Sequence, residues 1–216
     1  MVNGSMSLHP PITHKARDRI CTAALEEFAS KGFDGANVAR IAASAGVSQP
    51  SVHYHFQSKD ALWQAAMSLL HGQLVTRQQT RRQGYSVLSP FDQLKTTCIA
   101  LIEQSAASPV LGRIILSEGQ TGGERFDWLM QNVLSDVYFE FLQLIERCLE
   151  EGLIKAYRPH HILMLLHGAA VTQFNVAPLT AALFGENCRE PGNVTAFSQL
   201  YVDVIFSGLA QNKEGP

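Results

Sequence analysis

Apolar residues recur every three or four positions along almost the whole chain, which is the spacing of amphipathic helices. The first stretch of this kind is expected to run from Thr13 to about Lys31, and Gly32 follows it as a residue that tolerates the positive φ angle of a helix end. The apolar residues that share one face of this helix are Ile20, Cys21, Ala24, Leu25 and Phe28. No stretch shows convincing strand alternation, so the pattern predicts helices throughout.

The segment "ANVARIAASAGVSQPSVHYHF", residues 36–56, predicts two short helices joined by a tight turn. Asn37 can cap the first of them, because its side-chain oxygen can accept hydrogen bonds from the free amides of the first turn. Ser48 can cap the second in the same way, and Pro50 is tolerated because it lies in that helix's first turn. Gly46 lies between the two helices, where the chain needs a positive φ angle.

A fourth helix is expected to begin at Lys59, capped by Ser58, and to continue towards Arg82. The pattern then breaks over residues 81–90, "RRQGYSVLSP". Beyond this break, further helices are expected over residues 91–105, 110–119, 124–151, 159–174, 177–184 and 193–209. The fold class expected from the sequence is all-α, with a three-helix domain at residues 1–60 and a larger helical bundle at residues 61–216.

The two short helices carry the packing pattern of a helix-turn-helix. Ala42 is small where the helices would cross, and Gly46 follows four residues later at the turn. Val52 follows after six more residues and is expected to face inward with Ile41 and Val47. With this spacing the second helix packs across the first while its amino-terminal end projects outward.

The projecting end carries side chains suited to a DNA groove. Gln49 can form a bidentate pair with adenine, Ser51 can bond a base edge or a phosphate, and Pro50 can touch a thymine methyl group. Ring donors and an ammonium group for phosphates or base edges follow at His53, Tyr54, His55 and Lys59. The full set of predicted DNA contacts is Arg40, Ser48, Gln49, Pro50, Ser51, His53, Tyr54, His55 and Lys59. A solvated helix face carries the same residue types, so this segment alone leaves both interpretations open.

Several motifs in register resemble the DNA-binding domain of the tetracycline-repressor (TetR) family of bacterial transcription regulators. They lie in the run "AALEEFASKGFDGANVARIAASAGVSQPSVHYHFQSKDAL", within residues 16–67. The matching features are the Gly-Phe step after the first helix, the Ile-Ala and Ala-Gly-Val-Ser motifs, the aromatic-rich run, and the Lys-Asp pair at 59–60. Gln49-Pro50 also resembles the tetracycline repressors proper. The resemblance implies a ligand-responsive, sequence-specific regulator, a repressor that a small molecule releases from a palindromic operator.

Two positions depart from the family pattern. Ala36-Asn37-Val38 replaces the commoner threonine-rich cap, which puts a phosphate contact from that point in question. His53 stands where tyrosine is usual. It still supplies a ring donor, but the operator sequence cannot be carried over from relatives.

The resemblance further implies that residues 61–216 bind a small molecule and form a homodimer. The predicted pocket combines apolar side chains with a few polar ones, as ligand sites usually do, and consists of Met67, His71, Leu101, Gln104, Ser105, Trp128, Tyr138, Phe141 and His167. Ordinary helical-bundle core is the alternative for each of them. The predicted dimer residues recur at helical spacing in two stretches and are His161, Met164, Leu165, Gly168, Ala169, Thr172, Phe197, Leu200, Tyr201, Val204 and Gly208.

Charge is distributed unevenly along the chain. Residues 1–83 contain nine Lys and Arg against five Asp and Glu, a net charge of +4, whereas residues 84–216 contain eight against fourteen, a net charge of −6. Only the basic front half is therefore expected to meet a polyanion. Residues 1–60 alone hold six basic and five acidic residues, which keeps an alternative open: a helical small-molecule or protein-binding module that has lost DNA binding.

Other chemistries find little support in the sequence. The four cysteines lack paired spacing, and Cys21, Cys98 and Cys148 are expected to be reduced core residues. His160, His161 and His167 have no carboxylate or cysteine at ligand spacing, so no metal and no cofactor is predicted. There is no nucleophile elbow, phosphate loop or paired-carboxylate motif, so an enzyme is not expected.

The expected partners are a double-stranded DNA operator, an unidentified small-molecule effector and a second copy of the chain. No apolar run approaches the roughly 20 residues that span a bilayer, and the N-terminus lacks the pattern of a secretory signal. The chain is therefore expected to be cytoplasmic and to have no membrane partner.

Overall fold

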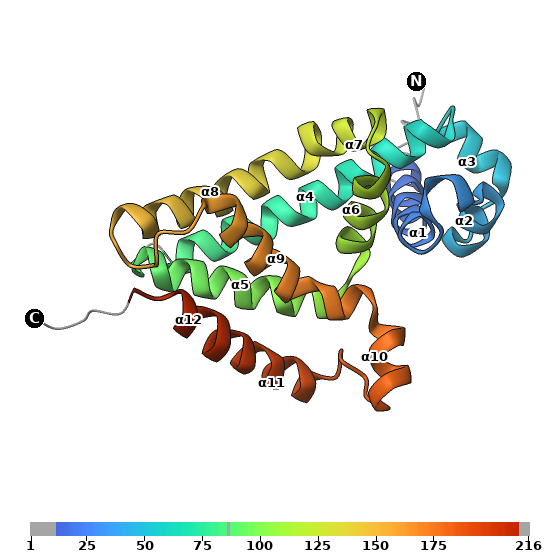
Figure 1. Cartoon of the computed structure of the whole chain (residues 1–216). Coiled ribbons are helices and arrows are strands. Elements are labelled where there is room, and N and C mark those ends of the chain that lie inside the picture. The colour runs from blue at the N-terminus through green and yellow to red at the C-terminus, as the bar shows by residue number, and fades with distance from the viewer. Residues whose placement is uncertain (1–11, 86, 212–216) are drawn as a thin grey trace, which may run out of the picture. The chain divides into compact units, whose positions relative to one another are not determined.

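The computed structural model of the protein describes residues 12–85 and 87–211, which form helices joined by short turns (Figure 1). The only strand-type pairing among these residues is an isolated bridge between Ile154 and Ala210. The all-α fold class is confirmed. The chain divides into two compact units, Met1–Gln73 and Leu74–Pro216, called here the N-terminal unit and the C-terminal unit.

The N-terminal unit contains α1 (Ile12–Gly35), α2 (Val38–Ala45), α3 (Gln49–His55) and the first part of α4 (Lys59–Tyr85). The C-terminal unit contains the rest of α4 and then α5 (Pro90–Ala107), α6 (Val110–Thr121), α7 (Glu124–Leu129), a π-helical turn (Met130–Leu134), α8 (Ser135–Glu150), α9 (Pro159–Asn175), α10 (Ala177–Phe184), α11 (Pro191–Tyr201), a second π-helical turn (Val202–Phe206) and α12 (Ser207–Leu209). Because α4 continues across the division at 73/74, the functional boundary expected at residue 60 stays a prediction.

The core of the N-terminal unit uses the apolar face predicted for the first helix. Ile20 and Ala24 are fully buried, and the ring of Phe28 stacks on that of Phe33 with the ring centroids 5.8 Å apart. Ile41 from α2 and Val52 from α3 are buried as well. The inward-facing positions of the helix-turn-helix are thereby confirmed, except Val47, which is only half-buried.

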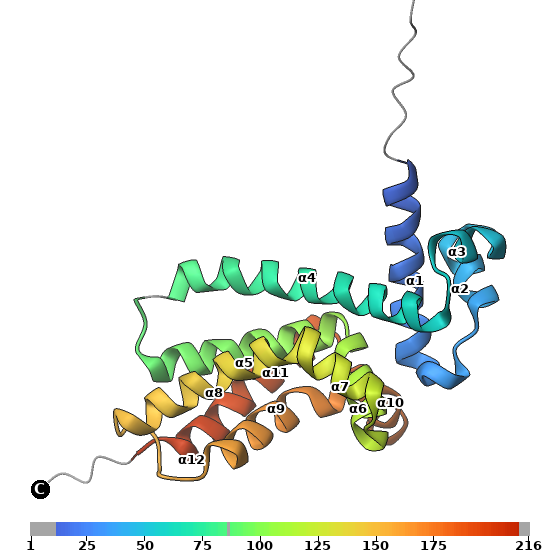
Figure 2. The ribbon, with the colours of Figure 1, turned by 90° about the horizontal axis from the view of Figure 1, so that it is seen from above.

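In the C-terminal unit, α5, α8 and α9 pack against one another (Figure 2). Each contributes side chains spaced three or four residues apart, and the fully buried ones include Leu94, Cys98 and Ile102 of α5, Ile145 and Cys148 of α8, and Leu166 and Phe174 of α9. Such spacing places all of these groups on one stripe of each helix. These three helices therefore share a continuous apolar core.

Tyr201 of α11 belongs to this core. Its side chain is 3% exposed, and its hydroxyl donates a hydrogen bond of 2.8 Å to the carbonyl oxygen of Leu166. The position of Tyr201 in the core of its own chain corrects its assignment to a dimer surface. The polar tip of a buried tyrosine needs such a partner, and this bond joins α11 to α9.

Two helices expected to be continuous are interrupted. The helix predicted over 124–151 contains the π-helical turn Met130–Leu134, and the helix predicted over 193–209 contains the π-helical turn Val202–Phe206. A π-helical turn widens the helix locally and so shifts which face the following residues occupy. In α1, Gly32 has φ 66° and ψ 175°, so the regular helix breaks there as expected, although helical hydrogen bonding resumes as far as Gly35.

All four cysteines are free and buried, which confirms the interpretation of Cys21, Cys98 and Cys148 as reduced core residues. Burial raises the pKa of the Cys98 thiol to about 12 and that of Cys21 to about 11, so both stay protonated at neutral pH. Among the described residues, no single helix is long and apolar enough to cross a membrane. The helix pairs α5–α6 and α9–α10 meet that test only when taken together, and they bend by 93° and 68°.

Candidate nucleic-acid interface

The turn between α2 and α3 has the backbone geometry that the sequence predicts. Gly46 lies in the left-handed region with φ 65° and ψ 39°, where a side chain would be strained. The backbone amide of Val47 donates a 3.0 Å hydrogen bond to the carbonyl oxygen of Ala42, which closes the end of α2. The chain can therefore leave α2 and enter α3 within three residues.

Side chains fix the beginnings of both helices. The side-chain oxygen of Asn37 accepts hydrogen bonds from the amides of Ala39 at 2.8 Å and Arg40 at 3.4 Å. The hydroxyl oxygen of Ser48 accepts one from the amide of Ser51 at 3.3 Å. Both predicted caps, and the cap of α4 by Ser58, are confirmed. Asn37 thus replaces a threonine-type cap without loss of capping.

α3 presents a buried face and an exposed face. Val52 and, just after the helix, Phe56 are buried and hold it against the unit. Tyr54 is 82% exposed and makes an edge contact with the ring of His55. The other side chains of the exposed face are Gln49, Pro50 and His53, while Ser51 and His55 are half-buried. The structure therefore brings the predicted contacts of α3 together on one accessible surface.

The side chain of Arg40 makes contacts that the sequence did not predict. Its guanidinium donates a 2.8 Å hydrogen bond from Nε to Glu27 of α1 and a 2.9 Å bond to the carbonyl oxygen of Gly35. Glu27 also accepts a 3.0 Å hydrogen bond from the backbone amide of Asn37. Arg40 thus ties α2 to α1, and its predicted contact with DNA stays a prediction.

Two positively charged side chains near α3 lie over aromatic rings. The Lys59 ammonium is 4.9 Å from the ring centroid of Phe33 and donates a 3.2 Å hydrogen bond to the carbonyl oxygen of Asp34. The Arg17 guanidinium is 5.3 Å from the ring centroid of Phe56. Sequence reasoning missed Arg17, although its place between Lys15 and Arg19 marked a basic stretch at the start of α1. Such ring contacts restrict the position of each charge.

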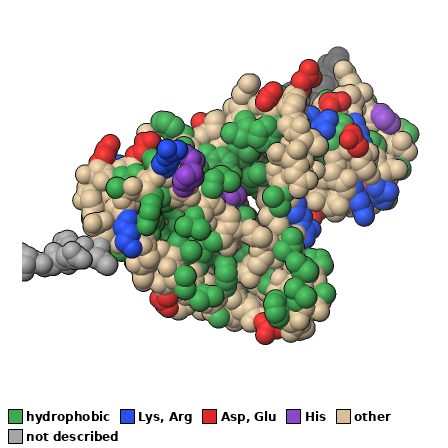
Figure 3. Space-filling view, in the orientation of Figure 1, with side chains coloured by type: hydrophobic (Ala, Val, Ile, Leu, Met, Phe, Trp, Pro, Cys, Tyr) green, Lys and Arg blue, Asp and Glu red, His purple; other side chains and the backbone are tan. Residues whose placement is uncertain are grey.

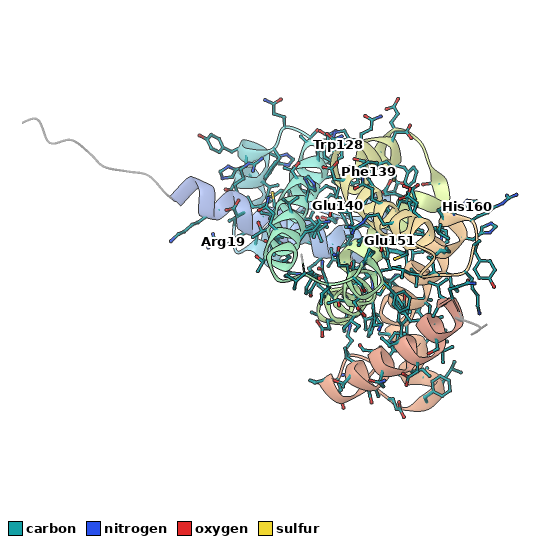
Figure 4. All side chains as sticks on the ribbon, turned by 90° about the vertical axis from the view of Figure 1, so that its left-hand side faces the viewer. Arg19, Trp128, Phe139, Glu140, Glu151 and His160 are labelled. Atoms are coloured by element: carbon teal, nitrogen blue, oxygen red, sulfur yellow. The ribbon has the colours of Figure 1, made fainter. Side chains whose placement is uncertain are left out.

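Charged side chains of both signs surround this unit. Lys and Arg side chains gather over α1 and α2, and a histidine lies over α3 (Figure 3). Arg19 projects away from α1 (Figure 4). Asp and Glu side chains lie on the same face of the unit (Figure 3). The basic character is therefore local to part of the surface rather than spread over the whole unit.

Replacing Glu27 with glutamine is expected to destabilise the N-terminal unit by about 1 kcal/mol at pH 7, because the hydrogen-bond acceptor for Arg40 loses its charge. The bond from Arg40, with that from the amide of Asn37, lowers the pKa of Glu27 in the folded chain. A lowered pKa contributes stability that is full above the unfolded value and is lost as the pH falls through the folded one. Urea unfolding at a series of pH values should show the difference between Glu27→Gln and the parent shrinking progressively as the pH falls below the unfolded pKa of about 4.3. A difference that persisted unchanged at pH 3 would contradict this assignment.

In the C-terminal unit the structure brings two of the predicted pocket residues into contact. The hydroxyl of Tyr138 and Nε2 of His167 are 3.4 Å apart. Burial lowers the pKa of His167 and raises that of Tyr138, so both are neutral at pH 7. Phe141 and Ser105 are buried, and Leu101, Gln104 and Trp128 are half-buried; Met67, which is buried, and His71 belong to the N-terminal unit. The pocket as a whole stays a prediction.

Most predicted dimer residues are accessible. Met164, Leu165, Leu200 and Val204 are more than half exposed, which is unusual for such large apolar side chains. His161, Thr172 and Gly208 are also exposed, and Gly168, Ala169 and Phe197 are half-buried. This exposure supports an interface on α9 and α11, and the interface stays a prediction.

Sequence reasoning also missed an ion pair between α6 and α7 whose acidic partner is buried. The carboxylate of Glu118 is buried and accepts a 3.2 Å hydrogen bond from Nε of Arg125. The two residues flank the turn at Gly122 and Gly123, which both have positive φ angles. The pair therefore fixes the course of the chain from α6 into α7.

A capped α2, a left-handed turn and a short α3 with an exposed polar face define a helix-turn-helix DNA-binding protein. Residues 20–66 match the family described as "Bacterial regulatory proteins, tetR family". Residues 20–66 thus form a DNA-binding domain of the TetR family, and the chain is a DNA-binding transcriptional regulator.

Individual relatives agree with this assignment along most of the chain. The regulator RutR of Escherichia coli K12 is 25% identical over 171 residues, which cover 79% of each chain. The crystal structure of SCO4942 from Streptomyces coelicolor, a candidate transcriptional regulator, is 28% identical with a TM-score of 0.63 and covers 90% of this chain and 98% of that one. FadR of Bacillus subtilis, solved with stearoyl-CoA, shares the fold at 15% identity with a TM-score of 0.66, over 89% and 98% of the two chains.

Proposed function

We propose that the chain is a homodimeric transcriptional repressor that reads a palindromic operator through α3 and leaves it when a small molecule binds. The observation that carries this proposal is the exposed polar face of α3, which is held in place by buried Val52 and Phe56. A helix of this length can enter the major groove with its amino-terminal residues at the base edges.

Within this proposal the side chains of α3 have separate roles. Gln49 pairs with an adenine, and Ser51 and Pro50 contact neighbouring base edges. His53, Tyr54, His55 and Ser48 contact phosphates or base edges, and Lys59, restrained over Phe33, donates to a phosphate. Arg40 is left out of the base-reading set because Glu27 and Gly35 already bind its guanidinium.

The proposed dimer explains how a seven-residue helix achieves specificity. One such helix reads too few base pairs, whereas two copies related by a two-fold axis read half-sites about one helical turn apart. The exposed apolar side chains of α9 and α11 support an interface of this kind.

The proposed effector site lies among the predicted pocket residues, and the contact between Tyr138 and His167 supports a polar anchor there. Both FadR bound to stearoyl-CoA and this chain have the same fold, which supports a ligand-responsive mode of action. The effector must bind the form that does not fit the operator more tightly than the form that does. We propose that α4, which continues from residue 59 to residue 85, transmits the conformational change from the effector site to the DNA-binding domain.

The remaining parts of the proposal follow from the same assignment. Residues 1–60 bind DNA, and residues 61–216 bind the effector and form the dimer. The protein acts in the cytoplasm, where the operator is, and it is a regulator without catalytic activity.

The salt dependence of DNA binding by the full chain tests this proposal. Neutralised phosphates release counterions, so the logarithm of affinity should fall linearly with the logarithm of salt concentration. About six phosphate contacts in a dimer would cost roughly 1,000-fold between 50 and 200 mM salt. Fluorescence anisotropy with labelled duplexes measures this slope. Absence of binding at low salt, together with binding of a small molecule by the same preparation, would favour the alternative of a helical ligand-binding module.

A further inference from the structure

α10 packs only weakly against the rest of its own chain. None of its residues is buried, and Leu183 and Phe184 are 64% and 70% exposed. Ala177 at its first position is its only residue packed against the core among the described partly buried hydrophobics. An isolated helix of eight residues is marginal in water, because so few hydrogen bonds must offset the cost of nucleation. Its apolar side chains are therefore placed to be covered by something outside the described chain.

The exposed apolar surface of α10 continues onto the two neighbouring helices. Leu179 and Val176 extend it towards α9, which exposes Met164 and Leu165, and α11 exposes Leu200. Figure 3 shows hydrophobic side chains gathered over these three helices of the C-terminal unit. Exposed apolar side chains that gather on a protein surface are typical of an interaction site.

The same surface is almost free of charge. Residues 159–185 contain no Lys, Arg, Asp or Glu, and neither do residues 191–202, although 17% of the whole chain is charged. In an interface between identical copies, each patch meets itself, so any charge near the two-fold axis would oppose its own copy. A long charge-free surface therefore fits a second copy of this chain better than a partner recognised by charge.

We propose that α10 docks onto the apolar surface of a second copy and extends the proposed dimer interface beyond α9 and α11. This inference rests on the proposed function, because it assumes the dimer. The structure gives α10 a defined start and end for this role: the amide of Leu179 bonds the carbonyl oxygen of Val176 at 2.8 Å, and Gly185 ends the helix with φ 69°. The other face of α9 is buried in the core of its own unit, so α9 does not present apolar surface all round as a bilayer-spanning helix would.

The first test compares the dimer dissociation constants of the full chain and of the double variant Leu183→Glu/Phe184→Glu, by analytical ultracentrifugation. The expected result is a weakening of at least about 30-fold, which corresponds to about 2 kcal/mol and to the loss of one interface hot spot. The matched control is Phe139→Glu. Phe139 lies on α8 and is 61% exposed, so its substitution replaces an exposed aromatic ring by a carboxylate outside this surface, with one added charge against two in the double variant (Figure 4).

A second variant separates this inference from the dimer itself. Leu165→Glu alters the α9 surface that the proposed function already uses. If Leu165→Glu dissociates the dimer while the α10 variant leaves it intact, the dimer stands and the role of α10 is overturned. A parent chain that is monomeric at all concentrations overturns both.

Two further measurements complete the test, and the first of them uses the parent chain alone. Hydrogen exchange of residues 177–184 should slow when the protein is concentrated from the monomer to the dimer range, and equal exchange at both concentrations contradicts the proposal. Flotation with vesicles of zwitterionic and anionic lipid tests a membrane instead. Vesicle binding that the α10 variant abolishes, with an unchanged dimer, would overturn the proposal in favour of a lipid surface.

Discussion

Gln49→Ala is expected to weaken binding to the operator by about 10- to 100-fold while leaving binding to random DNA nearly unchanged. The side chain is exposed at the first position of α3, where a groove-bound helix presents residues to base edges. A bidentate pair with adenine contributes about 1–3 kcal/mol of discrimination, and alanine removes both hydrogen bonds. The measurement is a pair of anisotropy titrations, on operator and random duplexes, at one fixed salt concentration.

Lys59→Ala provides the matched comparison for Gln49→Ala. Its ammonium contacts the ring of Phe33 and the carbonyl oxygen of Asp34, and the proposal assigns it to a phosphate rather than a base. Its loss should weaken operator and random DNA to the same extent and reduce the slope of the salt dependence by about one. Equal losses on both duplexes for Gln49→Ala would remove Gln49 from the base-reading set.

Phe28→Ala is expected to destabilise the N-terminal unit by about 3–5 kcal/mol. Phe28 is 2% exposed and stacks on Phe33, so truncation leaves a cavity under α1 and also loses a ring contact. Because single domains have only about 5–15 kcal/mol of stability, this change removes a large fraction of it. Thermal unfolding followed by circular dichroism, with urea titration of the same samples, measures the loss.

Tyr54→Ala separates stability from DNA binding in the same unit. Tyr54 is 82% exposed, so its truncation should change the free energy of unfolding by less than about 0.5 kcal/mol. It should nevertheless weaken DNA binding, because the proposal places its hydroxyl at the DNA. A loss of stability for Tyr54→Ala comparable to that for Phe28→Ala would contradict the division of α3 into a buried and an exposed face.

The sequence was sufficient for the helix-turn-helix because local rules determine it. Asn37, Gly46 and Ser48 act within three residues of their own positions, and a cap or a positive φ angle has few alternatives there. The burial of Ile41 and Val52 follows from helical spacing alone. The same reasoning located the helices of the C-terminal unit, because their apolar period is long and regular.

Contacts between residues that lie far apart in the sequence could not be predicted from local patterns. Glu27 and Arg40 lie thirteen positions apart and meet only because α1 and α2 pack together. Nothing in the local pattern distinguishes this arginine from one that points into solvent. The contact of Arg40 with α1 could therefore not be predicted from its local sequence.

Helices with two apolar faces were the second feature that the sequence alone could not resolve. α11 buries Tyr201 and exposes Leu200, although both are apolar and adjacent. Periodicity shows that such a helix has more than one apolar side, but it cannot show which side packs inside its own chain. The π-helical turn Val202–Phe206 adds to the difficulty, because it changes the helical register.

Selection of bound sequences from a library of random duplexes, over several rounds with the full chain at low salt, tests the central claim most directly. The account predicts enrichment of one palindrome with half-sites about one helical turn apart. Gln49→Ala should enrich a relaxed version of the same palindrome. A library that stayed unenriched in the absence of effector would contradict sequence-specific DNA binding by this chain.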